Sequence, residues 1–264
     1  MNPKRIEILG VPVDCVTMES ALETVDAMVS GERPHVVVAV NPEKVIKARR
    51  DPDLLRQLQR TSLLIPDGIG VVLAARLLRL GRMGRVPGSE LMPAICGRAA
   101  RRGYRIFLFG ASPEVNRRTV EVLRHRYPGI HIVGHQHGYL GEAEMPALIE
   151  RINASRADVL FVALGSPKQE RWMDTYAPRL TVKVCQGVGG TFDVISGRVR
   201  RAPLFLRKLS LEWLYRLATQ PGRFLRQTAL PAFVFGVFQA LVSSAIRRRR
   251  RVRGVGGTSA QLPR

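Results

Sequence analysis

The feature that most constrains the fold is a repeated unit, in which a short apolar run leads into a polar or glycine-containing loop and then into a helical segment. The apolar runs are His35–Val40, Ser62–Ile65, Arg105–Phe109, Ile130–Val133, Asp158–Leu164 and Val182–Val184. Strands buried on both faces of a parallel sheet read as continuous apolar runs of this kind. Helices are predicted at Asp51–Arg60, Ile69–Leu80, Glu90–Arg101 and Glu142–Ala154. The alternation predicts an α/β fold with a Rossmann-like, mostly parallel sheet flanked by helices.

The loops that follow these strands indicate where a site would form. Ligands of open parallel sheets bind beyond the carboxyl ends of the strands. The polar or glycine-containing loops at such ends are Asn41–Glu43, Pro66–Gly68, Gly110–Ser112 and Gly165–Glu170. We therefore expect these loops to converge on one cleft.

Asp67 is the residue of these loops best suited to acid–base chemistry. It stands directly after an apolar strand and before Gly68. Partial burial there would raise its carboxyl pKa and fit it to act as a general base. An aspartate in this place can equally cap the helix that starts at Ile69, so both roles stay open.

The segment Gly165–Glu170 is a candidate phosphate-binding element. Gly165 permits close approach of a ligand to the backbone, Pro167 suits a first helical turn, and a helix N-terminus attracts anions. Lys168 and Gln169 are then candidates to bind a diphosphate or a sugar. An ordinary helix start with a solvated polar face explains the same residues.

A second glycine-rich segment, Gly187–Asp193, follows the last predicted strand. Its glycines suit a nucleotide-binding loop or a tight turn equally well. Asp193 is a candidate to accept hydrogen bonds from a base or a ribose.

Two patterns that suggest metal sites are better explained otherwise. Asp51 and Asp53 have the D-x-D spacing of some metal-dependent enzymes, but an Asp-Pro pair at a helix start is a sufficient explanation. The histidines His131, His135 and His137 have no Cys, Asp or Glu at ligand spacing beside them, so a solvated loop is the better interpretation. We predict neither a metal nor another cofactor.

The basic charge is concentrated near the C-terminal end. The chain has a net charge of +21, and residues 198–264 hold 15 Lys and Arg residues against one acid, Glu212. Arginines among aromatic and aliphatic residues suit an anionic membrane surface, although a helix pair on the core with a solvated basic face is the alternative. We divide the chain into an α/β core at 1–197, a basic helical appendage at 198–228, and an apolar segment with an arginine-rich tail at 229–264.

The apolar segment Ala229–Ile246 is nearly free of charge and 18 residues long, whereas a spanning helix typically needs about 20. Arginines lie on both sides of it, at Arg226 and at Arg247–Arg251. Spanning would place one of these clusters against the positive-inside rule. We expect this segment to lie in or dip into a membrane surface.

The cysteines and the first residues bear on the compartment. Cys15, Cys96 and Cys185 are far apart and set among apolar residues, which indicates reduced, buried thiols. Residues 1–10 hold no long apolar run of the signal-peptide kind. Together these features predict a protein on the cytoplasmic side.

Eight motifs, taken together and in order, resemble the WecG/TagA/CpsF glycosyltransferase family. They are VNPEKV (Val40–Val45), PDGIGV (Pro66–Val71), RVPGSEL (Arg85–Leu91), LFGAS (Leu108–Ser112), GSPKQERW (Gly165–Trp172), GVGGTFD (Gly187–Asp193), RRAP (Arg200–Pro203) and the pair LEWLYRL and PGRFLR (Leu211–Leu217 and Pro221–Arg226). The chain departs from the family pattern at Ala39, where a threonine is usual. The departure removes a hydroxyl near the donor sugar.

The resemblance implies an inverting, metal-independent transfer of an N-acetylmannosamine-type or glucose-type sugar from a UDP-sugar. The implied acceptor is a polyprenyl-diphosphate-linked sugar at the inner face of the membrane, in cell-surface polysaccharide biosynthesis. Asp67 would be the general base on the acceptor hydroxyl, and family members associate as oligomers. The donor-binding residues expected from the loops and motifs together are Asn41, Arg85, Gly110, Gly165, Lys168, Gln169 and Asp193. The residues implied to face the diphosphates are Arg216, Arg223 and Arg226.

Two other classes of protein compete with this interpretation. A nucleic-acid-binding protein would explain the net charge, but it predicts basic and aromatic residues spread over a folded surface rather than gathered after Gly197. A dinucleotide- or methyl-donor-dependent Rossmann enzyme needs a glycine fingerprint after the first strand, and Val40–Glu43 has none.

Overall fold

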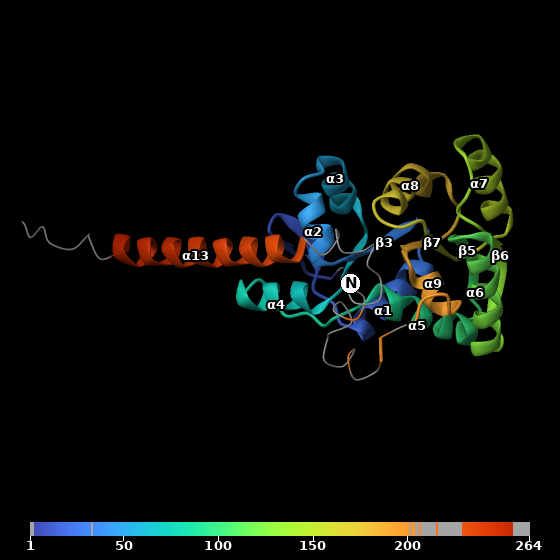
Figure 1. The fold of residues 1–264 in the computed structure, drawn as a ribbon, viewed down its shortest axis with the longest axis horizontal. Coiled ribbons are helices and arrows are strands. Elements are labelled where there is room, and N and C mark those ends of the chain that lie inside the picture. The colour runs from blue at the N-terminus through green and yellow to red at the C-terminus, as the bar shows by residue number, and fades with distance from the viewer. Residues whose placement is uncertain are drawn as a thin grey trace, which may run out of the picture.

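The computed structural model describes residues 3–32, 34–200, 202–203, 206, 215 and 229–255 of the 264-residue chain. Figure 1 shows an α/β body from which one long helix projects. The body holds a parallel six-stranded sheet with strand order β4-β3-β8-β7-β5-β6. Its strands are β3 (His35–Val40), β4 (Leu63–Pro66), β5 (Arg105–Gly110), β6 (His131–Gln136), β7 (Val159–Ala163) and β8 (Val184–Gly187). The prediction of an α/β fold with a mostly parallel sheet is confirmed.

Two layers of helices cover the faces of this sheet, because each central strand is apolar on both sides. Val38 and Val40 of β3 pack in one core cluster, whereas Val37 before them and Ala39 between them pack in the other. The helices over the first face are α2 (Pro42–Ala48), α3 (Pro52–Arg60), α7 (Met145–Ala154) and α8 (Lys168–Tyr176). Those over the second face are α1 (Met18–Val29), α5 (Gly88–Arg102), α6 (Pro113–Arg126) and α9 (Thr191–Ile195).

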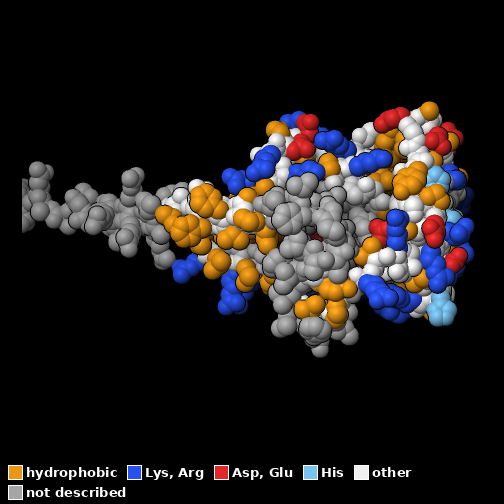
Figure 2. All heavy atoms as spheres, viewed as in Figure 1, with side chains coloured by type: hydrophobic (Ala, Val, Ile, Leu, Met, Phe, Trp, Pro, Cys, Tyr) orange, Lys and Arg blue, Asp and Glu red, His pale blue; other side chains and the backbone are white. Residues whose placement is uncertain are grey.

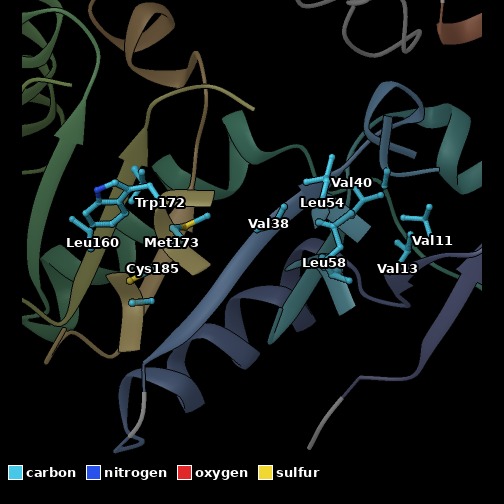
Figure 3. Packing of buried hydrophobic residues seen from close by; sticks show 14 of the residues in the cluster. Val11, Val13, Val38, Val40, Leu54, Leu58, Leu160, Trp172, Met173 and Cys185 are labelled. Atoms are coloured by element: carbon cyan, nitrogen blue, oxygen red, sulfur yellow. The ribbon is translucent and has the colours of Figure 1, made fainter. Parts of the chain in front are cut away.

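The first face shows how helix side chains fill the space above the strands. In Figure 3, Leu54 and Leu58 of α3 lie to one side of β3, and Trp172 and Met173 of α8 lie beside Leu160 of β7. All five side chains are buried. Two elements of the fold flank this face: an antiparallel hairpin of β1 (Arg5–Ile8) and β2 (Val11–Asp14), and the helix α4 (Ile69–Leu77).

Several predicted boundaries need correction. α4 ends at Leu77 rather than Leu80, because Arg79 adopts a left-handed φ of 55° that closes the helix. The last strand is Val184–Gly187 rather than Val182–Val184. The predicted helix Glu142–Ala154 is divided into a 3₁₀ turn, η1 (Glu142–Glu144), and α7; a second 3₁₀ turn, η2 (Ala177–Arg179), follows α8. The hairpin, α1, α2 and α9 were not predicted.

The C-terminal part of the described chain is α13 (Ala229–Val255), which extends away from the body in Figure 1. Its first turns pack against the body: Phe233 and Val237, one helical turn apart, are buried. Within the described residues, no helix is both long and apolar enough to cross a membrane. Arg216, Arg223 and Arg226 lie outside the described residues.

Candidate functional site

The loops predicted to form a site lie at the carboxyl ends of the strands, the edge of the sheet where backbone hydrogen bonds tie several of them to the neighbouring strand. The amide of Asp67 donates to the carbonyl of Val40 at 2.9 Å, which ties the loop after β4 to the end of β3. The amide of Val188 donates to Val162 at 2.9 Å, which ties the loop after β8 to the end of β7. Since β8 lies between β3 and β7, the loops after these three central strands are neighbours.

Asp67 is partly buried and lies one residue before the N-cap of the helix that follows. That N-cap is Gly68, with a φ of 93°. Asp67 therefore does not occupy the N-cap position itself. The general-base role stays a prediction, and the position it requires, at the carboxyl end of a buried strand, is present.

Asn41 and Arg85 flank Asp67 on the same edge. The Asn41 side chain caps α2 by accepting a hydrogen bond from the Lys44 amide at 2.8 Å, so this residue starts a helix rather than an open loop. Arg85 precedes Val86, whose amide donates to Pro66 at 2.8 Å, and its guanidinium lies 3.4 Å from Glu90. The bonds of Asp67 to Val40 and of Val86 to Pro66 therefore bring both predicted donor-binding residues near Asp67.

Ala39, where the resemblance implies a missing hydroxyl, lies beside Gly88 at the start of α5. A Cβ on Gly88 would be 3.5 Å from the Ala39 Cβ. The side chain of residue 39 therefore contacts the segment that carries Arg85, on the second face of the sheet.

The predicted segment Gly165–Glu170 passes from a loop into α8. Gly165 has a φ of 76°, and open space surrounds the position of a Cβ there. Lys168 is exposed at the first position of α8, where the helix dipole favours an anion. Gln169 is buried instead, and its Oε1 accepts a hydrogen bond from the Gly189 amide at 2.9 Å. This bond joins the two glycine-containing segments that the sequence singled out.

A buried ion pair lies behind these loops, and the sequence reasoning missed it. The Lys44 ammonium of α2 donates to Oε1 of Glu170 in α8, and both side chains are buried. Burial acts to raise the pKa of Glu170, but the Lys44 charge and the hydrogen bonds from Lys44, Gln169 and Ser166 outweigh it and lower that pKa. The sequence held one signal for a buried charge, which is that Lys44 directly precedes the apolar residues Val45 and Ile46.

The loop after β5 requires glycine for packing. Gly110 has a φ of 123°, and a Cβ there would lie 2.4 Å from the carbonyl oxygen of Ala163. Asn116 of α6 is buried beneath this loop and donates to the Gly110 carbonyl at 3.0 Å. Its Oδ1 is 2.8 Å from Nδ1 of His135 at the end of β6.

Asp193 lies at the start of α9, about one third exposed, with its carboxylate 4.0 Å from the Arg198 guanidinium. Its backbone carbonyl accepts from the Val199 amide at 2.9 Å. The residue therefore lies where the glycine-rich loop after β8 leads into the segment before the appendage.

The residues of the two metal-like patterns have other partners. Asp51 caps α3 through the Leu54 amide, and Asp53 pairs with Arg56. His137 accepts from the Tyr139 amide at 3.2 Å. In the part of the chain that the structure describes, no group of three His, Cys, Asp or Glu residues is placed to hold a metal.

Two hollows lie on the described surface near the sheet. One is lined by Arg5, His35 and Ser62 at the amino ends of β3 and β4. The other lies between α3 and α8, is lined by Val36, Gln57 and Met173, and reaches Glu170. Neither is lined by Asp67 or, apart from Glu170, by the other predicted loops, so the predicted single cleft is not among them.

The chain is similar to known glycosyltransferases over most of its length. The family model "Glycosyl transferase WecG/TagA/CpsF family" matches residues 6–247. Three similar proteins are each named N-acetylglucosaminyldiphosphoundecaprenol N-acetyl-beta-D-mannosaminyltransferase. One from Bacillus spizizenii is 36% identical over 79% of this chain and 80% of its own. One from Staphylococcus aureus strain MRSA252 is 34% identical over 90% and 94%, and one from Bacillus subtilis is 36% identical over 77% and 79%.

We predict that His135 makes the fold less stable in mild acid. Burial, followed by the charges of Arg124 and Arg151, lowers the pKa of His135 in the folded state. The unfolded chain therefore binds a proton first as the pH falls below about 6.5, and the free energy of unfolding decreases. In urea titrations at pH 7.5 and 5.5, His135→Gln should lose less stability than the wild type.

The matched control is His131→Gln at the start of the same strand, which leaves the contact between His135 and Asn116 in place and should follow the wild type. An unchanged pH slope in His135→Gln would contradict the assignment.

Proposed function

This chain belongs to the WecG/TagA/CpsF glycosyltransferase family, and from that premise we propose that it transfers a sugar from a UDP-sugar to a polyprenyl-diphosphate-linked sugar. The names of the similar proteins favour N-acetylmannosamine as the sugar and N-acetylglucosamine-diphosphoundecaprenol as the acceptor. The observation that carries the proposal is Asp67, a partly buried carboxylate at the carboxyl end of β4, beside the loops that follow β3 and β8.

In the proposed reaction, the hydroxyl oxygen of the acceptor attacks the anomeric carbon of the donor, and Asp67 accepts the proton of that hydroxyl. The new C–O bond forms on the face opposite the nucleotide, the bond from carbon to the diphosphate oxygen breaks, and UDP leaves with inversion. The exposed Lys168 at the amino end of α8 and the arginines Arg216, Arg223 and Arg226 would stabilise the charge on the departing diphosphate. Asn41, Arg85, Gly110, Gly165, Gln169 and Asp193 complete the proposed donor-binding set.

We predict that Asp67→Asn lowers the rate of transfer by about 10²-fold or more, because the amide cannot accept the proton. Binding of UDP, measured by calorimetry, should stay close to the wild-type value. The matched control is Asp53→Asn, an exposed carboxylate of α3 that should leave transfer unchanged. Near-normal turnover by Asp67→Asn would remove the general-base role.

We also propose that the transfer needs no divalent metal, since cationic side chains and a helix N-terminus can neutralise the leaving diphosphate. Activity should persist in excess EDTA. Loss of activity on chelation that Mg²⁺ or Mn²⁺ restores would contradict this proposal and bring Asp51 and Asp53 back as ligands.

We place the enzyme at the cytoplasmic face of the membrane, bound through an apolar patch on α4 and α13. The patch comprises the exposed side chains Leu73, Leu77, Val234, Phe235, Phe238 and Val242. Figure 1 shows α4 and α13 projecting from the same end of the body, and Figure 2 shows hydrophobic side chains gathered there next to basic ones. A Cβ on Gly70 would lie 3.8 Å from the Phe233 ring, so the two helices approach each other at their first turns.

The chemistry of this patch fits an anionic lipid surface. Aromatic and aliphatic side chains enter the interface, while basic residues such as Arg76 and Arg79 at the end of α4 meet lipid phosphates. A second copy of the chain is the competing occupant. An oligomer formed through another part of the surface is compatible with either occupant of the patch, the lipid surface or the second copy.

We predict that the double variant Phe235→Ser/Phe238→Ser binds anionic vesicles at least about tenfold more weakly, because it removes two aromatic anchors of the patch. Transfer to a short, soluble acceptor should be unchanged. Tyr139→Ser, which removes an exposed aromatic ring from the loop after β6, is the control. Unchanged vesicle binding would contradict the placement, and a loss of oligomers in light scattering would assign the patch to self-association.

A further inference from the structure

Three loops of the candidate site are joined by one buried series of hydrogen bonds, which begins with the ion pair of Lys44 and Glu170. Lys44 lies in the first turn of α2, directly after β3, and Glu170 lies in the first turn of α8, after β7. Their side chains are 7% and 2% exposed, so both charges are removed from water. A buried ion pair rarely adds stability over apolar residues of the same size. Stability alone therefore does not explain this pair.

This series of hydrogen bonds continues through Gln169 to the glycine-rich loop after β8. Nε2 of Gln169 donates to Oε1 of Glu170 at 3.1 Å, and Oε1 of Gln169 accepts from the Gly189 amide at 2.9 Å. Gly189 has a left-handed φ of 52°. A Cβ on Gly187 would lie 2.8 Å from Nε2 of Gln169, so the amide also packs tightly against the loop.

The two hydrogen-bond partners of Gln169, Glu170 and Gly189, fix the orientation of its amide. An ionised carboxylate only accepts hydrogen bonds, and a backbone N–H only donates them. The amide nitrogen of Gln169 must therefore point to Glu170 and the amide oxygen to Gly189. With the amide reversed, two donors would face each other at Gly189 and two acceptors at Glu170.

We propose that Glu170 is a positioning residue for the nucleoside diphosphate of the donor: it orients Gln169, and Gln169 holds the loop Gly187–Gly190 in its binding shape. Lys44 keeps the Glu170 carboxylate ionised in its buried position. This inference rests on the proposed function, because it takes the donor to be a nucleotide bound at the carboxyl ends of β7 and β8.

Two double variants separate the positioning role from simple packing. Lys44→Met/Glu170→Met removes both charges and every acceptor for Gln169. Lys44→Met/Glu170→Gln removes the same charges but keeps an amide oxygen that can accept from Gln169. Neither variant leaves an unpaired buried charge, so each should lose much less stability than the single variant Glu170→Met, which strands the Lys44 charge.

The test measures UDP affinity by calorimetry, and hydrogen exchange of residues 187–190 without ligand. We expect the Met/Met variant to bind UDP at least about tenfold more weakly, to raise the KM for donor more than it lowers kcat, and to exchange faster in the loop. The Met/Gln variant should stay within about threefold of the wild type, because the acceptor is restored.

Each other result overturns the inference in a recognisable way. Equal UDP affinity and equal exchange in all three proteins would show that Glu170 does not position the loop. Equal losses in both double variants would assign the pair to packing or charge alone. A wild type that binds no UDP would overturn the proposed function, and the exchange measurement would then still decide whether Glu170 orders the loop.

Discussion

The structure depends on one constraint, which is the burial of both faces of a parallel sheet. Adjacent residues of β3 and of β7 contribute to opposite core clusters, so neither strand has a face on which a polar group meets water. Polar chemistry is thereby restricted to the ends of the strands. The carboxyl ends hold Asp67, Gly110 and the segment from Gly165, and the loop hydrogen bonds that join them follow from the order of the strands.

The same constraint gives the glycines of the site a second role. Gly110 and Gly187 belong to motifs that suggest phosphate binding, yet a Cβ at either position would collide with a neighbouring loop: with the backbone of Ala163 in one case and the Gln169 amide in the other. Gly165 and Gly197 have open space around them. Close packing between loops therefore explains the first two glycines, while Gly165 remains accessible to a ligand.

Apolar runs and the turn residues that end them were sufficient to predict most of the sheet, because a run as short as Arg105–Phe109, followed by Gly110, suits a strand rather than a helix. α2 was not predicted, because its N-cap, Asn41, looks like a loop residue in the sequence. In the structure, the Asn41 side chain accepts a hydrogen bond from the Lys44 amide and so starts the helix. The site was predicted by strand ends and motifs alone. Lys44 and Glu170 were missed for a physical reason: the pairing of two charges 126 residues apart depends on the order of the strands, which no local pattern encodes.

α4 connects the proposed chemistry to the proposed membrane contact. It begins at Ile69, two residues after Asp67, and its nine residues span about 14 Å at 1.5 Å per residue. Leu73 and Leu77 are exposed one turn apart toward its far end, and the first turn of α13 packs at its near end. A lipid-linked acceptor presents its diphosphate at the level of the headgroups, with its sugar extending toward the protein. Because one short helix carries Leu73 and Leu77 and follows the proposed general base directly, the depth at which these side chains enter the interface would set the height of Asp67 above it.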